Sequence, residues 1–209
     1  EKLEFLKGVS TAVQIDITDG KFAGEATWPL AKPDKNFESI LREERGMPFW
    51  EDFDFEFDLM IKDPFSLVPD IIKAGASKIV LHAESLNLDN DQLLLDQLRT
   101  EGVVEVGIAF NINTDEETIK EFLAFADFVQ FMGIDKIGNQ GQPFDPAVIE
   151  KIKWLHRELP TMPIAVDGGM NLDTAGLVAD AGASKVVAGS YLLKSPHPLG
   201  AIREMRNLI

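Results

Sequence analysis

The stretch Ala74-Gly75-Ala76-Ser77-Lys78-Ile79-Val80 returns near the end of the chain as Ala181-Gly182-Ala183-Ser184-Lys185-Val186-Val187. Each copy follows a segment with helical spacing and runs directly into a short β-branched segment. Glycine is common just after a helix, because it adopts the left-handed conformation without a steric penalty. Each copy therefore predicts a helix, a tight turn and a strand. Any such turn selects glycine, so the fold depends on what surrounds the two copies.

Around these turns, short apolar segments alternate with longer segments of helical spacing. The predicted strands are Val13–Ile17, Phe55–Ile61, Lys78–His82, Val103–Phe110, Phe128–Met132, Pro163–Val166 and Lys185–Ala188. The predicted helices are Phe37–Arg45, Leu67–Ala74, Asp91–Thr100, Glu116–Phe125, Pro146–Glu158, Leu172–Asp180 and Leu199–Asn207. Strands that are apolar on both faces and alternate with helices indicate parallel βα units.

The number and order of these units favour a barrel. Seven units of about 30 residues each fit the chain of 209 residues, and no Gly-x-Gly-x-x-Gly follows the first strand, which argues against a dinucleotide-binding sheet. We predict the α/β class, a (β/α)8 TIM barrel forming a single domain over residues 1–209. The eighth strand is expected to be missing at the start, or the barrel to be open there, with one helix at Lys2–Lys7. The segment Lys32–Glu56 is expected to be a longer, irregular connection.

Composition and charge exclude several classes of function. The formal net charge of −15 argues against a nucleic-acid partner or an anionic membrane surface. No cysteine is present, which excludes disulfides and thiolate chemistry. No apolar run approaches the roughly 20 residues that cross a bilayer, and no basic-then-apolar signal opens the chain, so a cytoplasmic location is expected. One small phosphorylated ligand remains compatible, because a few backbone N–H groups can bind a phosphate locally.

Polar residues gather where the predicted strands end. They are Asp16, Asp19, Asp58, His82, Glu84, Asn111, Asp135 and Asp167. In barrels the reacting groups lie at the carboxyl ends of the strands. A pair of carboxylates with one protonated member suits proton transfer at carbon, and several carboxylates together also suit a hard divalent cation. The alternative is that some only cap helices or turns, which is the preferred interpretation for Asp19, Asp63, Asp145 and Asp173.

Glycine-rich turns follow the last two predicted strands, in Asp167-Gly168-Gly169-Met170 and Ala188-Gly189-Ser190. Such turns leave N–H groups available and let the backbone approach a phosphate closely. One turn of this kind is compatible with a purely structural role. Two in this order match the usual phosphate site of a barrel.

Together these motifs resemble the ribulose-phosphate 3-epimerase family. Val13–Gly20 is similar to its His-x-Asp-Val-Met-Asp-Gly segment, and Phe57–Ile61 to its Val-His-Leu-Met-Val. Ala74–Glu84 resembles its Ala-Gly-Ala followed by His-x-Glu, and the two glycine turns resemble the close of its signature. The resemblance runs from Val13 to Leu193.

The resemblance implies a reaction and a substrate. Members of the family epimerise C3 of a ketopentose 5-phosphate through an enediolate, with one aspartate removing the proton and another returning it on the opposite face. On this chain those aspartates are Asp16 and Asp167, and a phosphorylated small sugar is the expected partner. The implied substrate-binding residues are Met60, Met132, Gly141, Gly168, Gly169, Gly189 and Ser190.

The chain departs from the family at the metal site. In the family, two histidines complete the set of metal ligands, and this chain has Gln14 and Asp58 at those positions. Oxygen ligands suit Mg²⁺ or Mn²⁺ better than Zn²⁺ or Fe²⁺, so the candidate ligands are Gln14, Asp16, Asp58 and Asp167. Binding of no metal is the alternative. His82 is expected either to approach this site or to be a packed polar residue, whereas His156 and His197 are expected to be uninvolved.

Other departures leave more than one function open. The loop Asp135–Gln142, which closes over substrate in the family, is recast and one residue longer, and Thr18 replaces a methionine. A sugar-phosphate-binding protein without catalysis is the main alternative. A decarboxylase is disfavoured, because Lys62 does not fall at the lysine position of the Asp-x-Lys-x-x-Asp motif that such enzymes carry. A Schiff-base aldolase needs a lysine at the carboxyl end of a strand, whereas Lys78 and Lys185 lie at the amino ends. Barrels of this family commonly associate, so a homo-oligomer is among the expectations.

Overall fold

The computed structural model describes residues 3–139 and 141–209. Their contacts divide the chain into two compact units, one ending at Gly107 and the other beginning at Ile108. The boundary lies inside the strand β4, Glu105–Phe110, and not in a linker. No helix in the described ranges is long and apolar enough to cross a bilayer.

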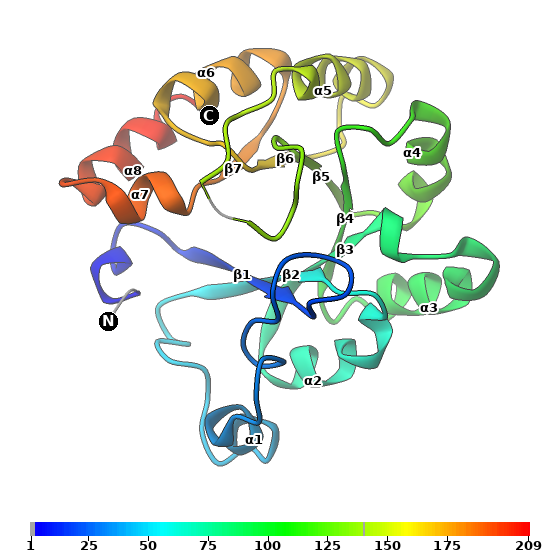
Figure 1. Cartoon of the computed structure of the whole chain (residues 1–209), viewed down its shortest axis with the longest axis vertical. Coiled ribbons are helices and arrows are strands. Elements are labelled where there is room, and N and C mark those ends of the chain that lie inside the picture. The colour runs from blue at the N-terminus through cyan, green and yellow to red at the C-terminus, as the bar shows by residue number, and fades with distance from the viewer. Residues whose placement is uncertain (1–2, 140) are drawn as a thin grey trace. The chain divides into compact units, whose positions relative to one another are not determined.

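The first unit contains three parallel strands in chain order, β1 (Ala12–Thr18), β2 (Asp54–Met60) and β3 (Ala76–His82) (Figure 1). Its helices are α1 (Lys35–Leu41), α2 (Val68–Lys73) and α3 (Leu88–Glu101), with 3-10 turns at Glu4–Leu6, Pro64–Ser66 and Ala83–Ser85. The three predicted strands are confirmed, each shifted or extended by one or two residues. Of the helix expected at Lys2–Lys7, only the 3-10 turn is present, and Lys2 lies outside the described residues.

The strand β2 is the centre of this unit. Phe55 through Met60 are all buried, including the polar side chains of Glu56 and Asp58. A strand with neighbours on both edges and helices beside it has no face for solvent. A carboxylate on such a strand needs partners, because an isolated buried charge is costly.

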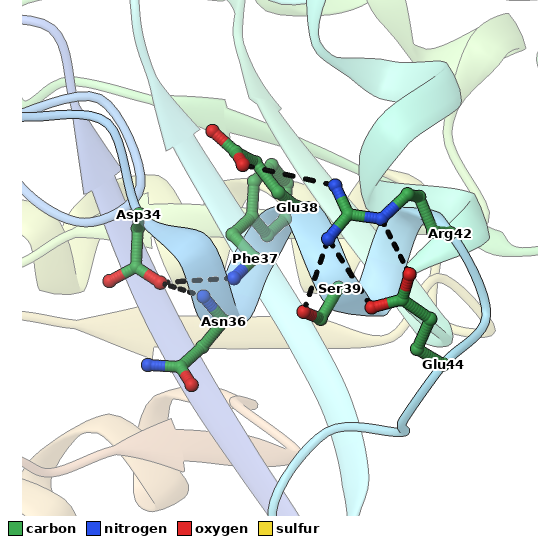
Figure 2. Close-up of polar contacts among 7 residues, drawn as sticks. All are labelled: Asp34, Asn36, Phe37, Glu38, Ser39, Arg42 and Glu44. Atoms are coloured by element: carbon green, nitrogen blue, oxygen red, sulfur yellow. Dashed lines mark hydrogen bonds and ion pairs between the residues drawn. The ribbon is translucent and has the colours of Figure 1, made fainter.

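The segment expected to be irregular contains α1, drawn in Figure 2. The Asp34 carboxylate accepts hydrogen bonds from the backbone N–H groups of Asn36 (2.8 Å) and Phe37 (3.0 Å), which caps the helix. After its last turn, Arg42 pairs with Glu44 at 2.7 Å. The helix ends earlier than the predicted Arg45, because Glu43 adopts a left-handed φ of 61°.

The second unit contains the parallel strands β5 (Phe128–Met132), β6 (Ile164–Asp167) and β7 (Lys185–Val187), again in chain order (Figure 1). Its helices are α4 (Glu116–Phe122), α5 (Ala147–Glu158), α6 (Leu172–Ala181), α7 (Ser190–Lys194) and α8 (Pro198–Arg206), with a 3-10 turn at Leu123–Phe125. The predicted elements are confirmed, and α7 is an addition. Both repeated turns are left-handed, with φ of 98° at Gly75 and 114° at Gly182.

Candidate active site

In the first unit, the register of β1 and β2 places two predicted site residues side by side. Asp16 and Asp58 are Cα partners across the two parallel strands, so their side chains point to the same face of the sheet. A carboxylate oxygen of each lies within 4.8 Å of the other. Asp58 is fully excluded from solvent. Two carboxylates at this separation cannot both carry their charge without cost.

The pKa of Asp16 reflects this arrangement. Burial raises it most, and the negative charge of Asp58 raises it further, to about 6. A hydrogen bond from Gln14 Nε2 to Asp16 Oδ1, at 3.0 Å, acts in the opposite direction by stabilising the charged form. Asp16 therefore exchanges its proton near neutral pH, as a general acid or base requires.

The buried charge of Asp58 has a partner on the next strand. Nε2 of His82, at the end of β3, lies 2.9 Å from Asp58 Oδ1, and both side chains are fully buried. Burial alone would lower the pKa of His82, but the charge and hydrogen bond of Asp58, with the charges of Glu84 and Asp16, raise it above its ordinary value. His82 is thus both a packed residue and a contact of the candidate site. The sequence left these two interpretations open as alternatives.

The loop after β1 closes over this histidine. The Asp19 carboxylate accepts hydrogen bonds from the N–H groups of Lys21 (2.8 Å), Phe22 (2.8 Å) and Lys62 (2.9 Å). Partial burial alone would raise the pKa of Asp19, but these three donors lower it. They hold the loop against the end of β2, and the Phe22 ring lies 5.7 Å from the ring of His82. The predicted turn-capping role of Asp19 is confirmed.

In the second unit, Asp167 is the last residue of β6. Its Cα partners are Met132 on β5 and Val187 on β7. Gly168 and Gly169 follow with φ of 103° and 70°. A Cβ atom at Gly169 would lie 2.6 Å from the Phe144 Cα atom, so packing forbids any larger residue there. At Gly189 φ is −100° and nothing lies within 4 Å of a Cβ atom, so neither conformation nor packing demands glycine.

A capping box fixes the turn that carries the two glycines. The Asn171 side chain accepts hydrogen bonds from the N–H groups of Asp173 (2.9 Å) and Thr174 (3.1 Å) at the start of α6. The Thr174 hydroxyl accepts from the Asn171 N–H at 2.8 Å and donates to the Gly169 carbonyl at 3.0 Å. The prediction that Asp173 caps this helix is wrong, because Asn171 occupies that position. The sequence does carry a signal for this cap, because Asn171 directly before the helical segment is a preferred N-cap residue, and the prediction overlooked it.

The remaining predicted site residues keep to their own elements. Met60 ends β2 and Met132 ends β5, and both are buried. Gly141 lies in the loop before α5, with φ of 80°, and Gln140 beside it lies outside the described residues. Gly189 and Ser190 form the start of α7, directly after β7.

Two further capping predictions have different outcomes. Asp145 accepts a hydrogen bond from the Ala147 N–H at 2.9 Å, as predicted. Asp63 stands before a 3-10 turn, but its side chain makes no capping hydrogen bond, so that prediction is wrong.

The donor groups in the first unit fit a hard divalent cation. The carboxylates of Asp16 and Asp58 are already close together, and their repulsion contributes to the raised pKa of Asp16. A cation between them would relieve this repulsion, and carboxylate and amide oxygens are the ligands that Mg²⁺ and Mn²⁺ prefer.

Known proteins resemble the chain over most of its length. The model of the Ribulose-phosphate 3 epimerase family matches residues 4–193. The ribulose-phosphate 3-epimerase of Chlamydia muridarum (strain MoPn / Nigg) is 36% identical over 191 residues, covering 87% of this chain and 76% of that protein. The ribulose-phosphate 3-epimerase of Bacillus subtilis (strain 168) is 32% identical over 206 residues, covering 96% and 88%.

Solved structures resemble the chain at lower identity. The 3-hexulose-6-phosphate synthase of Salmonella typhimurium superposes with a TM-score of 0.66 at 16% identity, covering 95% of this chain and 97% of that one. At this identity the likeness shows the fold alone. The superposition confirms the predicted barrel class.

Proposed function

The chain belongs to the ribulose-phosphate 3-epimerase family, and from that premise we propose that it transfers a proton at C3 of a phosphorylated ketose with two aspartates, Asp16 and Asp167. The observation that carries this proposal is the close, buried pairing of Asp16 with Asp58, in which burial and the charge of Asp58 raise the pKa of Asp16 to about 6. A carboxylate with that pKa removes a proton from carbon far better than an ordinary aspartate, and it still releases the proton near pH 7.

In the proposed reaction, the ionised Asp16 carboxylate takes the proton from C3. The electron pair of the broken C–H bond passes into an enediolate over C2 and C3. Asp167 then delivers its proton to C3 from the opposite face, which inverts that carbon. Each turnover leaves Asp16 protonated and Asp167 ionised, so the reverse reaction or proton exchange with water restores the starting state.

The negative charge that develops on the substrate needs stabilisation. Gln14, Asp16, Asp58 and Asp167 would hold a divalent cation, with Mg²⁺ or Mn²⁺ favoured by their oxygen donors. When bound, such a cation would supply positive charge at the enediolate oxygens. Loss of electrostatic help of this kind typically costs hundreds-fold in rate.

We propose that the glycine turns of the second unit bind the phosphate. Gly168 and Gly169 have a backbone that is held by the Asn171–Thr174 capping box, and Gly189 is a glycine that the fold itself does not require. Ser190 adds a hydroxyl at the start of α7. Met60, Met132 and Gly141 would lie beside the sugar.

A second candidate is a protein that binds a sugar phosphate without catalysis. The replacement of the family's two histidines by Gln14 and Asp58 favours it, whereas the raised pKa of Asp16 favours catalysis. The two candidates differ only in whether a proton leaves C3.

Proton exchange decides between them. The purified protein is incubated with D-ribulose 5-phosphate in D₂O, with Mg²⁺ or Mn²⁺ and separately with EDTA, and C3 is followed by NMR. We expect deuterium at C3, lost in the Asp16→Asn and Asp167→Asn variants. Phosphate-dependent binding without exchange in any arm would replace the epimerase with the binding protein.

A further inference from the structure

The buried contact between His82 and Asp58 gives the histidine a role that the proposed proton transfer does not use. Resting on the proposed function, we infer that His82 is a positioning residue, which holds the Asp58 carboxylate beside Asp16 and thereby sets the affinity of the site for a divalent cation. His82 would act only through Asp58 and would not itself touch the cation.

The strand register explains how the contact forms. Asp58 on β2 is the Cα partner of Val80 on β3. His82 lies two residues beyond Val80, so its side chain points to the same face of the sheet as Val80. Its ring reaches back diagonally, which places Nε2 2.9 Å from Asp58 Oδ1.

The surroundings leave the imidazole ring little freedom. His82 is fully buried, and the Phe22 ring lies against it, held by the Asp19 hydrogen bonds to the loop. On its other side, Nδ1 lies 4.0 Å from the Glu84 carboxylate. A ring enclosed in this way presents Nε2 in one direction, and so fixes the carboxylate that it contacts.

An aspartate carboxylate needs this help as much as an imidazole does. The terminal torsion of an aspartate is broad, so without a partner its two oxygens sample many directions. Metal-binding side chains are commonly oriented by a hydrogen bond from behind, and loss of that bond typically weakens metal affinity by 10–100-fold. Where a histidine ligand is usually oriented by a carboxylate, here a histidine orients a carboxylate.

A purely structural role is the competing explanation, because any buried carboxylate needs a partner. Two amide variants separate the explanations. In His82→Gln the amide nitrogen reaches the position of Nε2, and in His82→Asn it reaches only the position of Nδ1. Both replacement side chains are polar and uncharged, but only the first retains the contact to Asp58.

The test is a titration of the whole protein with Mn²⁺, followed by calorimetry and by the EPR signal of free Mn²⁺, without any substrate. We expect His82→Asn to weaken Mn²⁺ binding by about 10–100-fold and His82→Gln to stay close to the wild-type value. In an Asp58→Ala background, the same two changes should have no further effect on Mn²⁺ affinity. His156→Leu, at an exposed position on α5, is the control and should bind as the wild type does.

Three results would overturn the inference. The first is equal Mn²⁺ affinity of the two amide variants. The second is that His82→Asn weakens Mn²⁺ binding as much in the Asp58→Ala background as in the wild type. The third is absence of Mn²⁺ binding by the wild type. In the last case, deuterium exchange at C3 by the same protein would leave the proposed epimerase standing. Mn²⁺ binding that depends on His82, without any exchange, would instead sink the epimerase and keep this inference.

Discussion

Asp16 and Asp58 are register partners on adjacent parallel strands, and a carboxylate oxygen of each lies within 4.8 Å of the other. The register of β1 against β2 fixes this pairing, so the two carboxylates lie close together whenever the sheet is formed. Their repulsion is relieved by a proton on Asp16, by a cation, or by the contact of His82 with Asp58. The proposed acid–base chemistry and the proposed metal binding at this site would thus have one electrostatic origin.

The raised pKa of Asp16 predicts a pH-dependent cost to stability. Between the ordinary aspartate pKa of 3.8 and the folded-state pKa of about 6, the folded state binds more protons than the unfolded state, so the free energy of unfolding falls as the pH rises through that window. Asp16→Asn should remove this fall. In EDTA, the difference in the free energy of unfolding between Asp16→Asn and the wild type should therefore favour the variant by about 2–3 kcal/mol more at pH 7 than at pH 3.5.

Urea unfolding of both proteins across this pH range measures the difference. Asp89→Asn, at an exposed position in the first turn of α3, is the control and should track the wild type. Parallel stability curves for Asp16→Asn and the wild type would show that Asp16 titrates normally.

The contribution of Asp58 to this pKa can be isolated. Asp58→Asn removes the negative charge and keeps an oxygen that can accept from His82. The pKa of Asp16 should fall below about 6 but stay above 3.8, because burial is the larger cause and remains. A ¹³C NMR titration of the Asp16 carboxyl group reports it. An unchanged pKa would mean that the charge of Asp58 does not contribute to the shift.

Two glycine variants test the proposal that the glycine turns of the second unit bind a phosphate. Gly169→Ala should destabilise the protein by about 2 kcal/mol or more, since its Cβ atom would lie 2.6 Å from the Phe144 backbone at a φ of 70°. Gly189→Ala should unfold like the wild type, because the space around it is open.

The phosphate affinity of Gly189→Ala tests whether this glycine serves ligand binding. If a phosphate approaches the backbone at Gly189, the added methyl group of Gly189→Ala should weaken binding of inorganic phosphate and of the sugar phosphate in calorimetric titrations. Wild-type affinity in Gly189→Ala would remove this residue from the phosphate site.

The capping box of α6 should contribute to stability. Asn171→Ala removes the acceptor for the N–H groups of Asp173 and Thr174 and should cost about 1 kcal/mol. Asn171→Asp keeps an acceptor and is the matched control. Chemical denaturation measures the loss, and an Ala variant as stable as the Asp variant would contradict the capping role.

Local sequence patterns are enough to predict the order of the elements. The repeated Ala-Gly-Ala turns, the apolar strands and the helical spacing depend on local periodicity and turn chemistry, which each segment carries within itself. The family motifs likewise identified Asp16 and Asp58 as candidates before any contact was known. The predicted end of α1 was wrong, because the left-handed conformation of Glu43 has no local signature.

The contacts between polar residues, in contrast, depend on the tertiary structure. Asp58 and His82 are 24 positions apart, and their hydrogen bond depends on the register of β2 against β3. The covering of His82 by Phe22 depends on a hydrogen bond between Asp19 and Lys62, 43 positions apart. Register and loop closure are set by the packing of the whole sheet and not by any one segment. For that reason the sequence offered His82 two roles, and the structure joined them in one contact.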